Sequence, residues 1–206
     1  MCSEPGVELT TGTLLLQTYG LKEMQRASTT GVLKSDDKGQ TWSYLSVVAD
    51  GSSWNSGEPA LAVTRSGRLI CMMRTGGYLL ESTSEDNGST WKKPWYTPLH
   101  AVESPANLLR LSNGDVLCTY GYRGEPGTVG VKAAISCDEG ETWGPENIIV
   151  EGFPNWDCGY ASSVELEDGR VLTTYYYNLL DRYYLGGSFY DPRRLKTNEK
   201  QQNSAQ

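Results

Sequence analysis

Short apolar runs separated by glycine turns recur along the whole chain. The glycines of these turns fall 55, 47 and 55 residues apart, and two of the turns read Asn-Gly and Asp-Gly. Such dipeptides between apolar runs favour tight hairpin turns, because these turns need residues with positive φ. The pattern therefore predicts four hairpins of similar design, over Val7–Leu16, Leu61–Ile70, Leu108–Leu117 and Val164–Leu172, with turns at Gly12, Gly67, Gly114 and Gly169.

One complete repeating unit begins at Glu58. Its pattern predicts strands over about 58–63, 69–74 and 79–84, with a fourth strand after the next turn. Four strands joined by short turns form an antiparallel meander, and units of roughly 40 to 50 residues of this kind are the blades of a β-propeller. We therefore predict an all-β fold, a propeller of four-stranded antiparallel blades, with about four blades in this chain at about 50 residues each.

An eight-residue motif, S-x-D-x-G-x-T-W, precedes the fourth strand of three units. It covers residues 35–42, 84–91 and 136–143, and its tryptophans lie 49 and then 52 residues apart. The glycine allows a tight turn, the aspartate can accept backbone N–H bonds across it, and the tryptophan can pack between sheets. A residue needed once for catalysis would not recur in every unit. We therefore interpret Asp37, Asp86 and Asp138 as turn residues.

Composition agrees with many short strands, since the 206 residues include 13 Tyr, 6 Trp and 23 Gly. The formal charge of −7 and the pI near 4.8 argue against a nucleic acid or an anionic membrane as partner, although a local arginine cluster can still hold a small anion. No apolar run is long enough to span a bilayer. We expect the propeller over residues 1–190 and a polar, disordered tail over 191–206.

Five scattered cysteines lack the C-x-x-C spacing of zinc and redox motifs, so no metal or cofactor is predicted. Cys71 and Cys118 lie in apolar runs and are interpreted as small buried side chains. Residues 1–6 lack the charged and apolar regions of a signal peptide. The sequence leaves the compartment, the disulfide state and the oligomeric state open.

Strand direction locates a candidate site. In an antiparallel meander the glycine turns lie at one end of every blade, and the motif returns to that end. The first strand therefore begins, and the second ends, at the opposite end of the blade. Glu58 and Tyr160 begin first strands, and Arg74 and Arg123 end second strands. These four side chains, from three successive blades, are predicted to converge at one mouth of the central channel.

This residue combination suits a carboxylated sugar. Guanidinium groups match a carboxylate with paired hydrogen bonds, and a neutral Tyr activated by a Glu base avoids the repulsion that a nucleophilic carboxylate would meet. Asp157 is near enough in sequence to line the same mouth. Each of these residues also has an ordinary structural interpretation. The arginines could form salt bridges at strand ends, the tyrosine could be a packing residue and the glutamate could be a solvated turn residue. His100 is interpreted as a loop residue.

The motif matches the Asp-box (BNR) repeat, and the chain resembles the sialidase superfamily, most closely bacterial BNR-repeat sialidase-like proteins. The resemblance covers about residues 5–190. It implies an exo-acting, retaining glycoside hydrolase for a terminal acidic sugar, independent of metal, with Tyr160 as nucleophile and Glu58 as its base partner. It also implies that Arg74 and Arg123 are the second and third members of the arginine triad for the substrate carboxylate. Its matching segments are 5–16, 58–61, 72–75, 108–123 and 159–173.

The departures from the family pattern raise further hypotheses. The first triad arginine and the aspartic acid/base of the family lie upstream of the matching segments, and sialidases close six blades. The chain is thus expected to be a fragment or a truncated relative, with open blade edges that favour self-association.

Because Asp boxes also occur in other glycosidases and in sorting receptors, the alternatives are a non-catalytic propeller that binds glycans or other partners, and a hydrolase of a different glycan. For this family a secreted or periplasmic location is expected.

Overall fold

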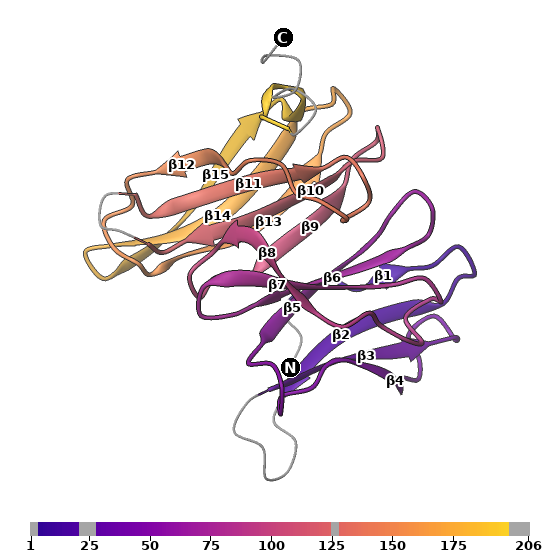
Figure 1. The fold of residues 1–206 in the computed structure, drawn as a ribbon. Coiled ribbons are helices and arrows are strands. Elements are labelled where there is room, and N and C mark those ends of the chain that lie inside the picture. Colours follow the sequence, from indigo (N-terminus) through magenta and orange to yellow (C-terminus); the bar gives the residue numbers. More distant parts are fainter. Residues whose placement is uncertain (1–3, 21–27, 125–127, 198–206) are drawn as a thin grey trace.

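The computed structural model describes residues 4–20, 28–124 and 128–197, and in this part of the chain the strands form four antiparallel sheets (Figure 1). Three sheets have four strands and the last has three. In chain order, the blades are β1 (Val7–Glu8), β2 (Leu14–Gly20), β3 (Thr29–Ser35) and β4 (Ser43–Ala49); β5 (Gly57–Val63), β6 (Leu69–Arg74), β7 (Tyr78–Ser84) and β8 (Trp95–His100); β9 (Ala106–Arg110), β10 (Val116–Tyr122), β11 (Gly130–Ser136) and β12 (Asn147–Glu151); and β13 (Cys158–Glu165), β14 (Val171–Leu179) and β15 (Arg182–Tyr190).

The glycine turns form as the sequence predicts. Each joins the first two strands of a blade, and Gly67 and Gly114 adopt φ of +93° and +94°, a region that favours glycine. The strands expected over about 58–63, 69–74 and 79–84 are β5, β6 and β7. The glycine turns thus set the pairing of the first two strands in each blade.

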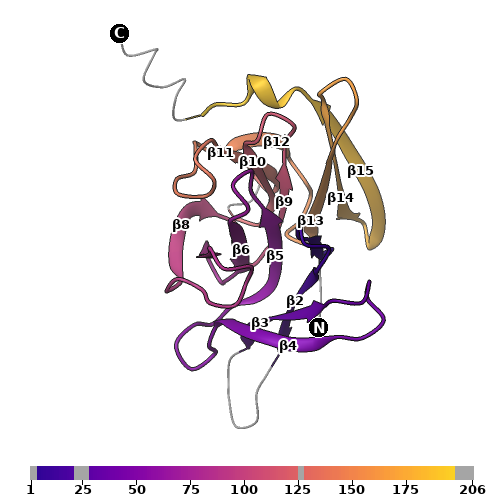
Figure 2. The ribbon, with the colours of Figure 1, turned by 90° about the vertical axis from the view of Figure 1, so that its right-hand side faces the viewer.

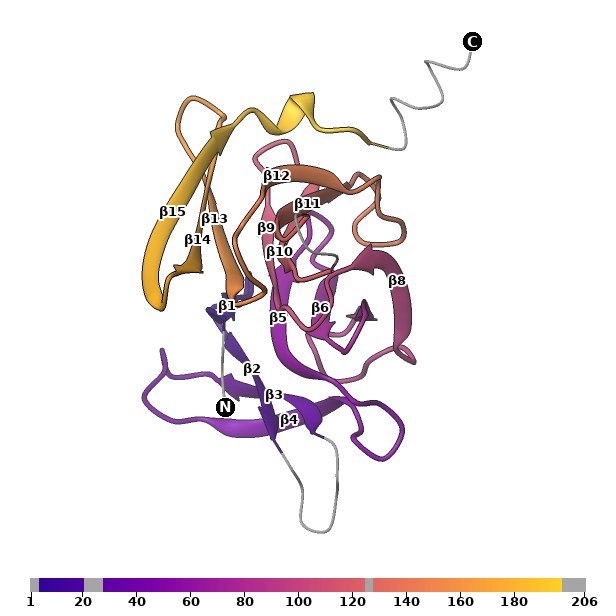
Figure 3. The same cartoon turned by 90° about the vertical axis from the view of Figure 1, so that its left-hand side faces the viewer.

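The blades are arranged around a centre, which confirms the propeller fold. In Figures 2 and 3, β5, β9 and β13 lie toward the centre and β4, β8 and β15 at the periphery. Apolar side chains fill the space between successive sheets. Leu15 packs in a cluster with Leu69, Met72 in a cluster with Tyr120, and Leu117 in a cluster with Val171. The core therefore consists of separate apolar layers, or seams, each lying between two successive blades.

The Asp boxes stabilise their turns by side-chain hydrogen bonds. Asp138 accepts hydrogen bonds from Ser136 Oγ (2.8 Å), Thr142 N (2.8 Å) and Thr142 Oγ1 (2.5 Å), and Asp37 and Asp86 have equivalent bonds. These bonds hold the pKa of Asp37 at about 2. The geometry supports a turn-forming role for all three carboxylates.

The box tryptophans join neighbouring blades. Trp91 Nε1 donates to Ser46 Oγ in the preceding blade (3.0 Å), and Trp143 Nε1 donates to Glu81 Oε2 in its preceding blade (2.7 Å). Trp42, in the first described blade, is 41% exposed and donates to Gly39 O in its own box. The indole of a box therefore packs between sheets when a blade precedes it.

The segment after Tyr190 differs from the expected disordered tail over residues 191–197. Pro192–Arg194 form a 3-10 helix capped by Asp191, and Leu195 is buried in the seam between the third and fourth blades. Asn147 exchanges two hydrogen bonds with Lys196. Apolar burial and paired bonds thus order a segment that looked polar in sequence. The remaining residues of the tail prediction, 198–206, lie outside the described residues.

Candidate active site

Glu58 and Tyr160 occupy the same place in two blades. Each follows a glycine at the start of the innermost strand, where the pairing with the next strand shifts register between Gly57 and Ala60, and between Gly159 and Ser162. Glu58 has φ +42° and Tyr160 φ +49°, a left-handed conformation that is uncommon for residues other than glycine. A bulge of this kind re-aims a side chain. The strained backbone therefore presents both side chains at the same end of their blades.

Glu58 is hydrogen-bonded to both a tyrosine and an arginine. Its Oε1 accepts a bond from the Tyr160 hydroxyl at 2.5 Å, and its Oε2 accepts one from Arg74 Nη1 within an ion pair. Glu58 and Tyr160 are 102 residues apart in sequence. The structure thus brings three of the residues singled out from the sequence into direct contact.

An open pocket of about 260 Å³ includes the Glu58 and Arg74 side chains. Its lining is mostly polar and comes from the first, second and third blades: Tyr19, Ser28, Asn55, Ser56, Gly57, Glu58, Arg74, Thr75, Gly76 and Glu103. The pocket is large enough for a small polar ligand beside the Glu58 carboxylate.

Tyr160 is neutral in this site. Burial, followed by the hydrogen bond and the charge of Glu58, raises the pKa of Tyr160 to about 12, although Arg74 and Arg123 act in the opposite direction. A neutral hydroxyl does not repel an anionic ligand. To act as a nucleophile it must transfer its proton, and Glu58 Oε1 is the hydrogen-bonded acceptor.

Arg123 lies beside the Tyr160 ring but is directed toward backbone oxygens. Its guanidinium carbon is 5.7 Å from the ring centroid. Nε and Nη2 donate to Cys158 O at 3.0 and 2.8 Å, and Nη1 donates to Glu103 O at 2.8 Å. In this arrangement Arg123 holds the chain immediately before Tyr160. Its role as a ligand for a substrate carboxylate stays a prediction.

Asp157 organises the rim next to this chain segment. Its carboxylate accepts bonds from the hydroxyls of Tyr176 (2.7 Å) and Tyr183 (2.8 Å) and from Asn178 Nδ2. These bonds hold the pKa of Asp157 below its usual value. The Tyr176 ring lies 5.9 Å from that of Tyr160. Asp157 therefore fixes aromatic side chains near the mouth.

His100 lies away from this group of residues. It is the last residue of β8 and not the loop residue that the sequence suggested; its backbone N–H donates to Glu146 Oε1 at 2.9 Å, and its ring lies 4.7 Å from that of Tyr78. These are the contacts of a packed side chain rather than of a base beside Glu58.

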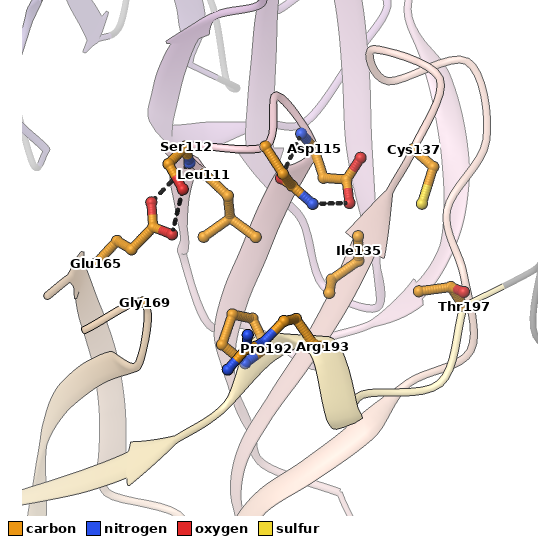
Figure 4. Close-up of a pocket in the computed structure, with 11 residues that line it drawn as sticks. Leu111, Ser112, Asp115, Ile135, Cys137, Glu165, Gly169, Pro192, Arg193 and Thr197 are labelled. Atoms are coloured by element: carbon orange, nitrogen blue, oxygen red, sulfur yellow. Dashed lines mark hydrogen bonds between the residues drawn. The ribbon is translucent and has the colours of Figure 1, made fainter. Parts of the chain in front are cut away.

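The Asp boxes and a second pocket occupy the other end of the blades. Glu139, in the third box, accepts a bond from Ser66 N in the hairpin turn of the second blade. The second pocket, of about 340 Å³, lies between the third and fourth blades and the C-terminal segment, where Glu165 accepts bonds from Ser112 (Figure 4). As expected from strand direction, the boxes and the Glu58 site lie at opposite ends.

Two glutamates near the site were missed by the sequence reasoning. Glu103 lines the Glu58 pocket, has φ +56° and supplies the carbonyl that Arg123 contacts. Glu4 is close enough to Glu58 for their charges to interact. The signal for Glu4 was the dipeptide Glu4-Pro5, which repeats Glu58-Pro59 one blade earlier. Glu103 precedes the first strand of its blade but has no comparable motif.

Neither a metal site nor a membrane helix is found in the described ranges. Within them, no cluster of three or more His, Cys, Asp or Glu side chains could bind a metal ion. No helix there has the length and apolar character needed to cross a membrane. Cys71, Cys118 and Cys158 are buried and Cys137 is exposed, while Cys2 lies outside the described residues.

The fold and the repeats define a BNR-repeat protein with a β-propeller fold. The family model for the BNR repeat-like domain matches residues 2–173, and the chain belongs to this family. No curated protein matches the sequence.

Solved structures with the same fold include proteins of different activities. A protein of unknown function from Dyadobacter fermentans is 27% identical, with a TM-score of 0.78 over 90% of this chain and 52% of its own. A Hadza microbial sialidase is 20% identical, with a TM-score of 0.70 over 92% of this chain and 37% of its own. The α-L-arabinanase of Penicillium chrysogenum is 20% identical, with a TM-score of 0.68 over 89% of this chain and 60% of its own. The chain thus spans between about a third and three fifths of these proteins.

Proposed function

We propose that the chain carries part of the active site of a sialidase-like glycoside hydrolase that removes a terminal acidic sugar with retention of configuration. The observation that carries the proposal is the Glu58 carboxylate, which accepts bonds from Tyr160 and Arg74 at one mouth of the propeller. Tyr160 is the nucleophile, Glu58 is its base, and Arg74 is part of the clamp for the sugar carboxylate. The partner is thus a glycan with a negatively charged end.

In the first step the Tyr160 oxygen attacks the anomeric carbon and its proton passes to Glu58. The glycosidic bond breaks, its electron pair stays on the leaving oxygen, and that oxygen takes a proton from an acid. In the second step water attacks the anomeric carbon and gives up a proton, the bond to Tyr160 breaks, and the tyrosine recovers its proton from Glu58. Two inversions give net retention.

The substrate charge favours Tyr over a carboxylate as nucleophile. Tyr160 is neutral before reaction, so the acidic sugar approaches without repulsion. A guanidinium has five N–H donors, and the bond to Glu58 occupies Nη1 of Arg74. The ion pair with Arg74 also fixes the Glu58 oxygen that faces away from Tyr160. The proposal assigns a substrate-binding role to Arg123 as well, which requires that its bonds to Cys158 O and Glu103 O exchange for bonds to substrate.

The test is hydrolysis of fluorogenic aryl sialosides by the wild-type protein and by Tyr160→Phe and Glu58→Gln. We expect each substitution to reduce kcat by at least about 100-fold, the effect of removing a positioned nucleophile or base. Tyr184→Phe is the matched control, because its ring stacks on Tyr177 instead. If Tyr160→Phe turns over the sialoside at the wild-type rate, Tyr160 is not the nucleophile.

Binding without hydrolysis is the second candidate function. The observation that favours it is Arg123, whose donors are engaged by backbone carbonyls beside the site. A protein of this kind would bind a sialylated glycan, and Arg74→Ala would abolish binding measured by calorimetry. Sialoside hydrolysis by the wild-type protein would exclude it.

A hydrolase of a different glycan is the third candidate. The fold likeness to the Penicillium arabinanase favours it, since that protein acts with the same architecture. Arabinofuranoside turnover, with no turnover of sialosides, would identify this case. The Glu58→Gln variant then shows whether the same carboxylate is used.

A further inference from the structure

Glu4 occupies, in the first blade, a place close to that of Glu58 in the second. It precedes the strand that leads into the Gly12 turn, and both glutamates are followed by proline. Glu4 lies five residues before Leu9, which begins its turn, whereas Glu58 lies six before Thr64, which begins the equivalent turn. The extra residue in the second blade is accounted for by the bulge in β5. The repeat therefore brings both side chains to the same end of adjacent blades.

The backbone at Glu4 is fixed next to the Glu58 pocket. Gln17, a fully buried residue of β2, donates from Nε2 to Glu4 O at 2.7 Å and to Pro5 O at 3.1 Å. Tyr19 lies two residues further along β2, on the same face of the sheet, and lines the pocket that contains Glu58. The backbone of Glu4 is thus bound by Gln17, which lies two residues along β2 from the pocket residue Tyr19.

The Glu4 side chain extends toward the third blade. Asn107 Nδ2, on β9, donates to Glu4 Oε2 at 3.0 Å. The Asn107 side chain is itself fixed, because its Oδ1 accepts a bond from Ser163 N in the fourth blade at 3.0 Å. Hydrogen bonds therefore connect the first, third and fourth blades, from Glu4 through Asn107 to the backbone of Ser163.

The surroundings of Glu4 favour its protonated form. Burial raises the pKa of Glu4 to about 7, with a further contribution from the charge of Glu58, while the Asn107 bond acts in the opposite direction. β2 and β9 face it with the uncharged side chains of Gln17 and Asn107. Glu58, on β5, is therefore the charged group that acts on it among the described residues around it. A carboxyl of this kind holds a proton near neutral pH.

The geometry points to Glu4 as a second carboxyl of the candidate site, a proton-holding partner of Glu58 that supplies the acid required by the leaving oxygen. This assignment rests on the proposed function. The Glu4 proton passes to the leaving oxygen as the glycosidic bond breaks. The resulting carboxylate then takes the proton that the attacking water gives up, while the Glu58 proton returns to Tyr160. Atoms and charges balance over the cycle, and each group ends in its starting state.

The direct test is a carboxyl titration by NMR of protein labelled with 13C at the glutamate side-chain carboxyl. We expect two glutamate carboxyls to titrate well above the usual range in the wild-type protein, Glu81 near pH 8 and Glu4 near pH 7, and the one near pH 7 to be missing in Glu4→Gln. In Glu58→Gln its midpoint should move to lower pH, because the neighbouring negative charge is gone. In Asn107→Ala it should move to higher pH, because the bond that stabilises the carboxylate is lost. Glu8→Gln, an exposed residue of β1, is the matched control and should leave the midpoint unchanged.

A Glu4 midpoint near 4.5 that Glu58→Gln does not move would overturn the assignment, whether or not the protein hydrolyses any glycoside. If glycosides are hydrolysed, Glu4→Gln should reduce kcat by roughly 100-fold or more for poor leaving groups and little for nitrophenyl glycosides, which need no acid. Equal losses for both leaving groups would also overturn it. Absence of hydrolysis by wild type refutes the proposed function, and the titration still decides whether Glu4 and Glu58 are coupled.

Discussion

At the scale of single residues, a buried carboxyl lies in the seam between two blades. Glu81, on β7, has no exposed surface, and its Oε2 accepts the indole N–H of Trp143 from the third blade. Its Oε1 has no hydrogen-bond partner among the described residues. A buried carboxylate with one donor is costly, so burial raises the pKa of Glu81 to about 8. The seam between the second and third blades therefore contains a carboxylic acid that stays neutral near pH 7.

This protonation makes stability depend on pH. The folded pKa lies above the unfolded value, so the stabilisation is fully present below about pH 4.5 and is lost as pH rises through about 8. Between these values the free energy of unfolding should fall by up to ~1.4 kcal/mol per pH unit on account of Glu81. Urea unfolding at several pH values between 5 and 8 measures the slope.

Glu81→Gln keeps an acceptor for Trp143 and cannot ionise, so its slope should be smaller than that of wild type. The exposed Glu167→Gln serves as control and should retain the wild-type slope. If Glu81→Gln and wild type lose stability in parallel over this pH range, Glu81 is not protonated in the folded protein.

The sequence predicted part of the site because strand polarity is a strong constraint. Glu58, Arg74 and Tyr160 had to lie at one end of their blades once the glycine turns were assigned to the other end. Arg123, which directly follows β10, also had to lie at that end, but the direction of its side chain depends on the carbonyls of Cys158 and Glu103. Those oxygens belong to irregular or bulged backbone, whose conformation has no periodic signal in sequence.

At the scale of elements, the Asp box joins two strands by side-chain bonds to its own turn. Burial alone would raise the pKa of Asp138, but the bonds from Thr142 and Ser136 hold it below its usual value. The same arrangement in three blades explains how a surface turn between consecutive antiparallel strands keeps its conformation. The box motif and the hairpins were recognisable in sequence for the same reason: both rely on local bonds within a few residues. The segment from Asp191 to Thr197 was not, since its order depends on Asn147 and on a seam distant in sequence.

Removal of one box carboxylate should therefore reduce stability without affecting the site. Asp138→Ala loses three hydrogen bonds, and we expect a loss of about 1–3 kcal/mol in the free energy of unfolding. Asp138→Asn, which keeps acceptor capacity, should lose less. Urea denaturation provides the measurement, with the exposed Glu151→Gln as control in the same blade.

Ligand binding or turnover per folded molecule should stay at the wild-type value in Asp138→Ala, because the box lies at the opposite end from Glu58. A variant that folds fully and yet loses ligand binding would contradict the turn-forming role of the box and restore a functional one.

At the scale of the whole molecule, the two outermost sheets have large exposed apolar side chains. Leu185 and Phe189 on β15 are 88% and 60% exposed, and Trp42 and Tyr44 at the first blade are 41% and 55% exposed. Exposed apolar surface of this kind marks interaction surfaces or aggregation-prone faces. A single exposed apolar residue is normal in a folded protein, but these residues share the outer faces of the array.

We predict that this chain self-associates in a concentration-dependent way through these faces. Light scattering coupled to size exclusion should show a rising average mass between low and high micromolar concentrations. The double variant Leu185→Lys and Phe189→Lys should shift the protein toward monomer, while Ser188→Lys, which points to the other face of β15, should shift it less. A wild-type protein that stays monomeric throughout the range would contradict the prediction.

The indole hydrogen bonds between blades all run the same way along the chain, from each box to the blade before it. Trp91 reaches back to Ser46 and Trp143 reaches back to Glu81, so each box completes its contacts on the blade synthesised before it. Glu139 and Glu165 likewise bind the hairpin turns of the preceding blades. The acceptors of each blade thus belong to a segment that precedes it in the chain. Deleting the first blade would leave Trp91 without its Ser46 acceptor, whereas deleting the fourth blade would leave the acceptors of Trp91 and Trp143 in place.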